Sequence, residues 1–477
     1  MSTDKSLYRI KGSVNNYPWG AKGSSSLVAQ LAPNSIGPSF KLEEDKPYSE
    51  LWIGTHPHGP AHLLSEAQSL QELITSNPVH HLGLGVLHKF KYHQLPYLFK
   101  VLSVGRALPL QAHPSKPLAH ELHRKDPAQF VDSNSKPEIA VAIGANGSVE
   151  QFLGLPLLHG GNRGEDATGV AFTGFVGFQP LEQIAYTLDH TPELRNAIDN
   201  LELVAKFIRD PQPAGLKEVY SDLLNRGAKD KDDVAAQISA YLKRVASSSQ
   251  EVDANDEGQR RMHAFGKVAR KVDSEYQGDV GVFATVFFLN LVQLRRSEAV
   301  FIDADEIHAY LEGGAYELKL FASSSDCMRT LTHYMRVVDI IECMATSDNV
   351  LNAAFPPPPP GEKVDELGSF ERTLNYTAAP PAHWALPTTP FKGHTTAYRP
   401  PLEEFIVLRT SLAGFPESLG RVGPTVGIVL KGAAKFMVGA EQELVDRGGV
   451  VFVSAGSEVV VEAQGDWAEI WWATCEA

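Results

Sequence analysis

Two short motifs in the middle of the chain place metal-capable side chains two residues apart. Gln111 and His113 lie in the run LPLQAHPSK, and Lys136 and Glu138 lie in SNSKPEIAV. Side chains at positions i and i+2 of a strand project from the same face, so each pair would point in one direction. Two strands that present such pairs would supply half of a metal coordination sphere. His308, in the run DADEIHAYL, is a candidate for completing it.

The ligand types suit a divalent cation but do not choose one. One carboxylate, two imidazoles and an amide oxygen would bind Zn²⁺ and would also accept Mn²⁺ or Fe²⁺. Either pair alone is more often part of a solvated strand face, so only the combination points to a metal. The opposite face of each predicted strand is apolar, with Leu108, Leu110 and Ala112 in the first and Ile139, Val141 and Ile143 in the second.

A further histidine pair, His56 and His58, looks like a metal pair on a strand. Pro57 lies between the two histidines, and Gly59-Pro60 follows them. Proline and glycine in these positions predict a turn. We therefore expect no metal at this pair.

The composition of the chain is that of a soluble globular protein. Its 477 residues are 43% hydrophobic and 21% charged, which predicts two or three domains. The net charge of −14 argues against nucleic acid and anionic membranes as partners. The chain has no run of about 18 apolar residues, and its first residues lack the apolar core of a signal peptide. We expect a cytoplasmic location.

Three cysteines, Cys327, Cys343 and Cys475, are too few and too scattered for a disulfide framework or a cysteine-based zinc site. Any metal must therefore be held by histidine and oxygen ligands. This agrees with the ligand set proposed above.

Strand-like and helix-like patterns divide the chain. Short strand-like runs broken by glycine and proline open it, whereas residues 181–275 have the pattern of helices, the clearest with Val234, Ile238 and Tyr241 on one face. Strand patterns return from Gly281. Five prolines at 356–360 predict an extended spacer, and strand-and-turn alternation runs from about residue 395 to the end.

Several longer motifs occur in order along the chain. They are NYPWG at 16–20, ELWIGTHP at 50–57, LFKVLSV at 98–104, QAHPSK at 111–116, KPE at 136–138, GDVGVFA at 278–284, HAYL at 308–311 and ECMATSDNV at 342–350. Together they resemble type I mannose-6-phosphate isomerases, zinc-dependent sugar isomerases of the cupin superfamily. The resemblance extends over nearly the whole chain.

The resemblance implies a mainly β fold with an α insertion, made of two cupin or jelly-roll β domains plus a helical domain. A metal-binding, cupin-like catalytic domain would comprise residues 1–180 and 276–355, interrupted by the helical insertion at 181–275. A linker at 356–394 would lead to a C-terminal jelly-roll-like domain at 395–477. No histidine follows His394, so we expect this last domain to be structural.

The resemblance also implies roles for single residues. The expected zinc ligands, for one ion per chain, are Gln111, His113, Glu138 and His308. The expected substrate-binding residues are Trp19, Lys100 and Lys116. The expected catalytic groups are Lys136, Asp348, Glu50 and Tyr310. Lys100 interrupts an apolar run, where a lysine needs a partner or a function.

The implied reaction is the interconversion of mannose 6-phosphate and fructose 6-phosphate through an enediol, which would feed GDP-mannose synthesis. The zinc ion would polarise the C1 and C2 oxygens as a Lewis acid. Lys136 would lie beside the ion, which would lower the pKa of this lysine and make it a proton shuttle. We expect a phosphosugar substrate and a monomeric protein.

Four positions depart from the family pattern. Asn352 stands at an arginine with a catalytic role, Pro358 at a lysine of the substrate pocket, Pro109 at a serine and Ser135 at the histidine of NHKPE. Asn352 can donate a hydrogen bond but supplies no fixed charge. Two alternatives therefore stay open, an isomerase of unphosphorylated sugars and a non-catalytic metal- and sugar-binding paralogue. Residues 314–338 are an insertion near His308 that would either reshape the pocket or loop outward.

Overall fold

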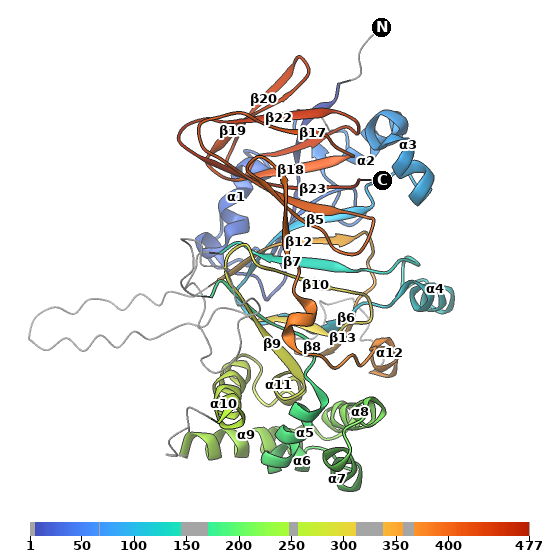
Figure 1. Ribbon diagram of the computed structural model, residues 1–477, viewed down its shortest axis with the longest axis vertical. Helices are drawn as coiled ribbons and strands as arrows, with labels where there is room; N and C mark the ends of the chain where they lie inside the picture. Colours follow the sequence, from blue (N-terminus) through green and yellow to red (C-terminus); the bar gives the residue numbers. More distant parts are fainter. Residues whose placement is uncertain are drawn as a thin grey trace, which may run out of the picture.

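The computed structural model describes residues 5–65, 67–144, 170–247, 256–311, 337–355 and 367–476. Within these ranges, four β-sheets and a group of helices are stacked along the long axis of the molecule (Figure 1). Almost all of the insertion at 314–338, and the prolines at 356–360 with Pro358 among them, fall outside the described residues. A helix long and apolar enough to cross a membrane is not found in the part of the chain that the structure describes.

Two antiparallel sheets form the central sandwich, as alternating apolar faces predict. In spatial order, the six-stranded sheet contains β10 (Ala299–Ile302), β7 (Glu138–Ala142), β12 (Val338–Ala345), β5 (Tyr97–Val104), β3 (Glu50–Ile53) and β2 (Ser13–Asn15). The five-stranded sheet contains β13 (Leu351–Ala354), β6 (Leu110–Ala112), β11 (His308–Leu311), β8 (Phe172–Phe178) and β9 (Leu289–Leu294). Leu102, Val176 and Tyr310 belong to the core between them.

A second sandwich lies beyond the six-stranded sheet (Figure 1). Its eight-stranded sheet contains β14 (Thr388–Lys392), β15 (Thr395–Tyr398), β16 (Ile406–Leu412), β23 (Ala468–Thr474), β18 (Thr425–Lys431), β21 (Val450–Val453), β1 (Leu7–Lys11) and β4 (His62–Leu63). Its four-stranded sheet contains β17 (Glu417–Arg421), β22 (Glu458–Ala463), β19 (Ala433–Val438) and β20 (Glu441–Asp446). Phe99 and Val101 pack with Trp471 in the core that joins the two sandwiches.

The first strand of the chain belongs to this second sandwich. β1 pairs antiparallel with β21, with Leu7 opposite Val453 and Ile10 opposite Val450. Without β1, β21 would present a row of unpaired backbone N–H and C=O groups. The opening stretch thus contributes to both sandwiches, and the proposed domain boundaries stay a prediction.

The helical insertion covers the outer face of the five-stranded sheet (Figure 1). Its helices are α5 (Leu181–His190), α6 (Pro192–Asn196), α7 (Leu201–Arg209), α8 (Pro213–Lys229), α9 (Lys231–Ser247), α10 (Glu257–Glu275) and α11 (Gly281–Val286). Val234, Ile238 and Tyr241 are the buried face of α9, as predicted. The mainly β fold with an α insertion is confirmed.

The remaining helices cover sheet edges and loops. They are η1 (Gly23–Ser25), α1 (Leu27–Ser35), α2 (Leu70–Ser76), α3 (Pro78–Phe90), α4 (Lys116–Lys125), α12 (Leu367–Thr373) and η2 (Pro381–Trp384). The described part of the expected linker, with α12 and η2, is packed and is not a free spacer. Trp384 is buried over Gly177, whose φ of 60° and lack of a Cβ admit the indole.

Asp339 on β12 makes the stability of the folded protein depend on pH. It lies opposite Ser103, whose hydroxyl donates a 2.7 Å hydrogen bond to it. Burial raises the pKa of the Asp339 carboxyl to about 7, against the opposing effects of Ser103 and Arg296. Between its unfolded pKa of about 4 and about 7, the folded state keeps a proton that the unfolded state has lost. The contribution of Asp339 to stability therefore falls as the pH rises across this window.

The Asp339→Asn variant has no ionisable group at this position. Above the pH window, we expect its free energy of unfolding to exceed that of the wild type by about 2 kcal/mol. The gain should shrink as the pH falls. Urea denaturation at several pH values measures it. A gain that does not change with pH would contradict the assignment to this carboxyl.

Candidate metal centre

Three side chains from the two facing sheets of the central sandwich converge on one buried point. Glu138 begins β7, His308 begins β11, and His113 directly follows β6. His308 Nε2 lies 3.2 Å from Glu138 Oε1, and His113 Nε2 lies 3.5 Å from Glu138 Oε2. Ligand atoms at about 2.0–2.1 Å from a tetrahedral zinc ion are about 3.3 Å apart. The spacing of the three residues therefore fits one such ion.

Hydrogen bonds fix which nitrogen of each histidine faces the centre. His113 Nδ1 lies 2.9 Å from the carbonyl oxygen of Asn349, and His308 Nδ1 lies 3.1 Å from that of Glu306. A carbonyl only accepts, so each Nδ1 carries the proton and each Nε2 offers a lone pair. Both Nε2 atoms are buried and lack a hydrogen-bond partner among the described residues. Such orphaned acceptors are what a bound cation would satisfy.

The protonation states also suit metal binding. Burial, assisted by the charge of Lys136, lowers the pKa of His113 to about 3, so the imidazole is neutral at neutral pH. Burial by itself raises the pKa of Glu138, but the two adjacent imidazoles lower it well below its usual range. The neutral His113 imidazole and the ionised Glu138 carboxylate are the protonation states that metal binding requires.

Gln111, the fourth expected ligand, lies in β6 beside the centre. The register between strands places it opposite His308 on one side and opposite Asn352 on the other. Asn352, the residue that replaces the expected arginine, therefore lies one strand beyond Gln111, on the side away from His308. Two other positions that depart from the family pattern lie close by in the sequence. Pro109 immediately precedes β6, and Ser135 immediately precedes Lys136.

A buried network of charges adjoins the centre. Lys136 Nζ lies 3.9 Å from Glu138 Oε2, and Lys100 Nζ lies 2.8 Å from Glu342 Oε2 and 3.9 Å from Glu50 Oε2. Burial acts to lower the pKa of Lys100, but Glu342 and Glu50 raise it above its usual range. Burial and the nearby Lys100 lower the pKa of Lys136. Lys100 is thus held as a cation, and Lys136 is the lysine that loses its proton more readily.

Tyr310 and Trp19 lie in the same region of the sandwich. The Tyr310 hydroxyl donates a 3.0 Å hydrogen bond to Glu138 Oε1. Trp19 is buried in the same apolar core as Tyr310 and stacks on Tyr17 with 5.7 Å between ring centroids. Trp52 Nε1 donates a hydrogen bond to Glu50 Oε2, which fixes that carboxylate beside Lys100.

Two other expected site residues lie outside this buried cluster. Lys116 is exposed at the start of α4 and lines a surface hollow with Ser135 and Thr346. Asp348 contacts His56 and His58. Arg106 donates a 2.8 Å hydrogen bond to the carbonyl oxygen of Glu275 and so faces the helical insertion.

Asp132 holds the loop that carries Asn349. Its Oδ1 accepts from the Ser347 hydroxyl at 2.9 Å and from Asn349 Nδ2 at 3.2 Å, and its Oδ2 accepts from the Asp348 N–H at 2.8 Å. The carbonyl of Asn349 in turn orients His113. Asp132 is therefore a positioning residue for the centre.

We expect Asp132→Ala to weaken zinc binding by about 10- to 100-fold, the usual effect of losing such a partner. Competition with a fluorescent chelator measures the affinity. Asp132→Asn keeps one acceptor oxygen and should lose less. Asp45→Ala, at an exposed carboxylate, is the control. Equal losses in Asp132→Ala and Asp45→Ala would contradict the role.

The site residues predicted from the sequence do not include Glu342 and Asp132. Glu342 carries a usable signal, because a carboxylate within the apolar strand β12 needs a partner for the same reason as Lys100 does. Asp132 carries no such signal, since its role comes from contacts with residues more than 200 positions away.

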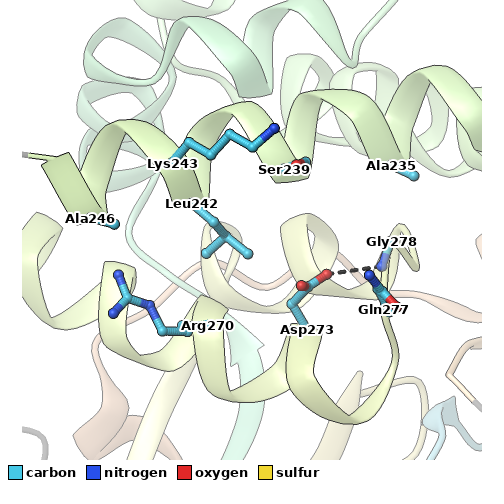
Figure 2. Close-up of a pocket in the computed structure, with 9 residues that line it drawn as sticks. All are labelled: Ala235, Ser239, Leu242, Lys243, Ala246, Arg270, Asp273, Gln277 and Gly278. Atoms are coloured by element: carbon cyan, nitrogen blue, oxygen red, sulfur yellow. Dashed lines mark hydrogen bonds between the residues drawn. The ribbon is translucent and has the colours of Figure 1, made fainter.

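A second hollow lies in the helical insertion, apart from the metal centre. Figure 2 shows it between α9 and α10, with Lys243 and Arg270 at its sides and the Asp273 carboxylate accepting a 2.9 Å hydrogen bond from the Gly278 N–H. None of the expected site residues lines it.

Comparison with known proteins gives consistent results. Residues 7–153 match the model of the catalytic domain of type I phosphomannose isomerases, and residues 191–289 match the model of their helical insertion domain. The mannose-6-phosphate isomerase of Cryptococcus neoformans is 36% identical, with 96% of each chain covered. That of Saccharomyces cerevisiae is 32% identical, again with 96% of each chain covered.

Solved structures agree in fold. A variant phosphomannose isomerase from Salmonella typhimurium is 22% identical, with 99% of this chain and 100% of that chain covered and a TM-score of 0.72. A zinc-bound mannose 6-phosphate isomerase has the same identity, coverage and TM-score. At this identity the likeness shows the shared fold.

Proposed function

This chain belongs to the type I phosphomannose isomerase family, and on that premise we propose that it interconverts mannose 6-phosphate and fructose 6-phosphate with the help of zinc. The observation that carries the proposal is the buried set of His113, Glu138 and His308, whose two orphaned imidazole nitrogens and one carboxylate match zinc ligands. Gln111 is proposed as the fourth ligand. When bound, zinc would polarise the sugar oxygens as a Lewis acid.

Lys136 is the proposed proton shuttle. Isomerisation moves a proton between C1 and C2 through an enediol, so a buried group must take it from one carbon and return it to the other. The amine of Lys136 lies near Glu138 Oε2, a proposed ligand oxygen, and the lysine side chain is buried. Tyr310, through its bond to Glu138, and Glu50, through its contact with Lys100, are proposed to position these groups.

The charge balance of the pocket favours an anionic substrate. Three buried carboxylates, Glu50, Glu138 and Glu342, outnumber the two buried lysines, Lys100 and Lys136, by one. While Lys136 is protonated, a divalent cation turns this deficit into an excess of one positive charge, which suits a phosphosugar. Trp19 and Lys100 are proposed to line the pocket, and Lys116 to bind the phosphate from its exposed position at the start of α4.

Asn352 supports an alternative. It lies beside Gln111, where the family has an arginine, and an amide cannot replace the charge of a guanidinium. An isomerase of unphosphorylated sugars, or a metal- and sugar-binding paralogue without turnover, is therefore the second candidate function.

A coupled assay of zinc-loaded protein distinguishes these functions. Turnover of mannose 6-phosphate that a chelator abolishes and zinc restores is the expected result. Turnover of mannose but not of its phosphate would select the altered substrate. No turnover of either sugar at full zinc occupancy would refute the isomerase.

The cellular setting is proposed on the same premise. A cytoplasmic monomer that supplies mannose 6-phosphate to GDP-mannose synthesis, without nucleic-acid or membrane partners, agrees with the acidic composition. Size-exclusion chromatography with light scattering tests the monomer.

A further inference from the structure

We propose that His56, His58 and Asp348 form a second binding site for a divalent cation of the zinc type, separate from the centre at His113, Glu138 and His308. The three residues offer two imidazole nitrogens and one carboxylate oxygen within 4.8 Å of one another. They come from the loop after β3 and from the loop between β12 and β13, at the end of the central sandwich. The site would take the cation alone, with water completing its coordination.

The distances match those of the first centre. Asp348 Oδ1 lies 3.1 Å from His56 Nε2 and 3.2 Å from His58 Nδ1, against 3.2 Å and 3.5 Å between the carboxylate and imidazoles of the first centre. All four values are near the separation of about 3.3 Å expected for ligands of one tetrahedral ion. The ring centroids of His56 and His58 lie 5.6 Å apart, close to the 5.1 Å between His113 and His308.

Two of the three ligands are held in place before any ion binds. His56 is 2% exposed and its ring meets the Trp52 indole edge-on at 4.9 Å. The N–H of Asp348 donates to Asp132, which fixes the backbone that carries the carboxylate. His58 is 65% exposed, so the site is open to solvent on its side. Two fixed ligands and one exposed ligand leave a coordination position open to water, as in zinc sites with three protein ligands.

The turn predicted from the prolines is present and creates the pair. The N–H of Gly59 donates a 3.1 Å hydrogen bond to the carbonyl oxygen of His56, which closes the turn around Pro57. The turn brings both imidazoles to the same oxygen of Asp348. In a strand, the two side chains would project from one face, and a shared ligand would have to lie above that face. The turn by itself therefore does not rule out a metal at this pair, and the proposal departs from the expectation drawn from the sequence.

A proton competes with the cation. The N–H of His58 donates a 3.3 Å hydrogen bond to His56 Nδ1, so the proton of a neutral His56 ring lies on Nε2, facing Asp348. A cation at Nε2 moves this proton to Nδ1 and breaks the hydrogen bond. We therefore expect weaker binding than at the first centre, where the Nδ1 protons already face carbonyl groups.

The test is the zinc stoichiometry of the full chain, measured by equilibrium dialysis and atomic absorption at neutral pH. About two ions per chain are expected for the wild type and about one for His58→Ala, because both sites follow the ligand rules of zinc. His93→Ala, which removes another exposed histidine, should keep both ions. His113→Ala should keep the weaker ion and lose the tighter one.

A wild type that binds only one ion, or a second ion that persists in His58→Ala, would overturn the proposal. The cluster would then be a hydrogen-bonded group without a metal. His58 is exposed, so its replacement should leave the fold intact, which circular dichroism checks. The experiment counts bound ions and does not depend on turnover. A negative result for the second cation site is therefore distinct from a negative result for the proposed isomerase function.

Discussion

His113→Ala should abolish stoichiometric zinc binding at the first centre and reduce isomerase activity by more than the 10- to 100-fold typical of losing a residue that only orients a metal ligand. The side chain is fully buried, and its Nε2 is one of two orphaned acceptors that face Glu138. Without it, only Glu138, His308 and the proposed amide ligand Gln111 remain, so the site loses one of its two imidazoles. Atomic absorption and the coupled assay on mannose 6-phosphate measure the two effects.

His120→Ala is the control, because His120 is exposed on α4, only seven residues further along the chain. It should keep both zinc and activity. The site assignment would be refuted by His113→Ala protein that keeps the tighter zinc ion. Added zinc should not restore activity to His113→Ala, whereas it should restore the chelator-treated wild type.

Lys100→Met should lower the free energy of unfolding by about 3–5 kcal/mol, the cost of removing one partner of a buried ion pair. Lys100 and Glu342 lie directly opposite each other on β5 and β12, 2.8 Å apart and almost fully buried. Methionine keeps most of the length of the side chain but leaves Glu342 as a charge without a partner at that distance. Urea denaturation of the purified protein measures the loss.

The double variant Lys100→Met/Glu342→Leu should recover most of the loss, because it removes the stranded charge as well. Lys89→Met is a matched control, since the Lys89–Glu403 pair has the same 2.8 Å separation but is exposed. It should cost less than about 1 kcal/mol. Equal losses of unfolding free energy in Lys100→Met and Lys89→Met would contradict the role of burial. A double variant as unstable as Lys100→Met would contradict the role of the unpaired Glu342 charge.

Much of the site follows from local sequence pattern. Alternation of polar and apolar residues predicted the strands around Gln111 and Glu138, because successive side chains of a strand point to opposite faces. A helical period predicted the buried face of α9, which is confirmed. The ligand types of His113, Glu138 and His308 limited the chemistry to a divalent cation before any contact was known.

The tertiary structure alone decided which of these residues meet. His113 and His308 are almost 200 residues apart, and only the pairing of β6 with β11 places them 5.1 Å apart. Asp348, a catalytic candidate from the sequence, is instead brought to His56 and His58. β1 joins the sheet of the last domain through β21. Local patterns indicate which face of a strand is buried. The order of the strands in a sheet depends on pairing between distant segments, which no short stretch of sequence contains.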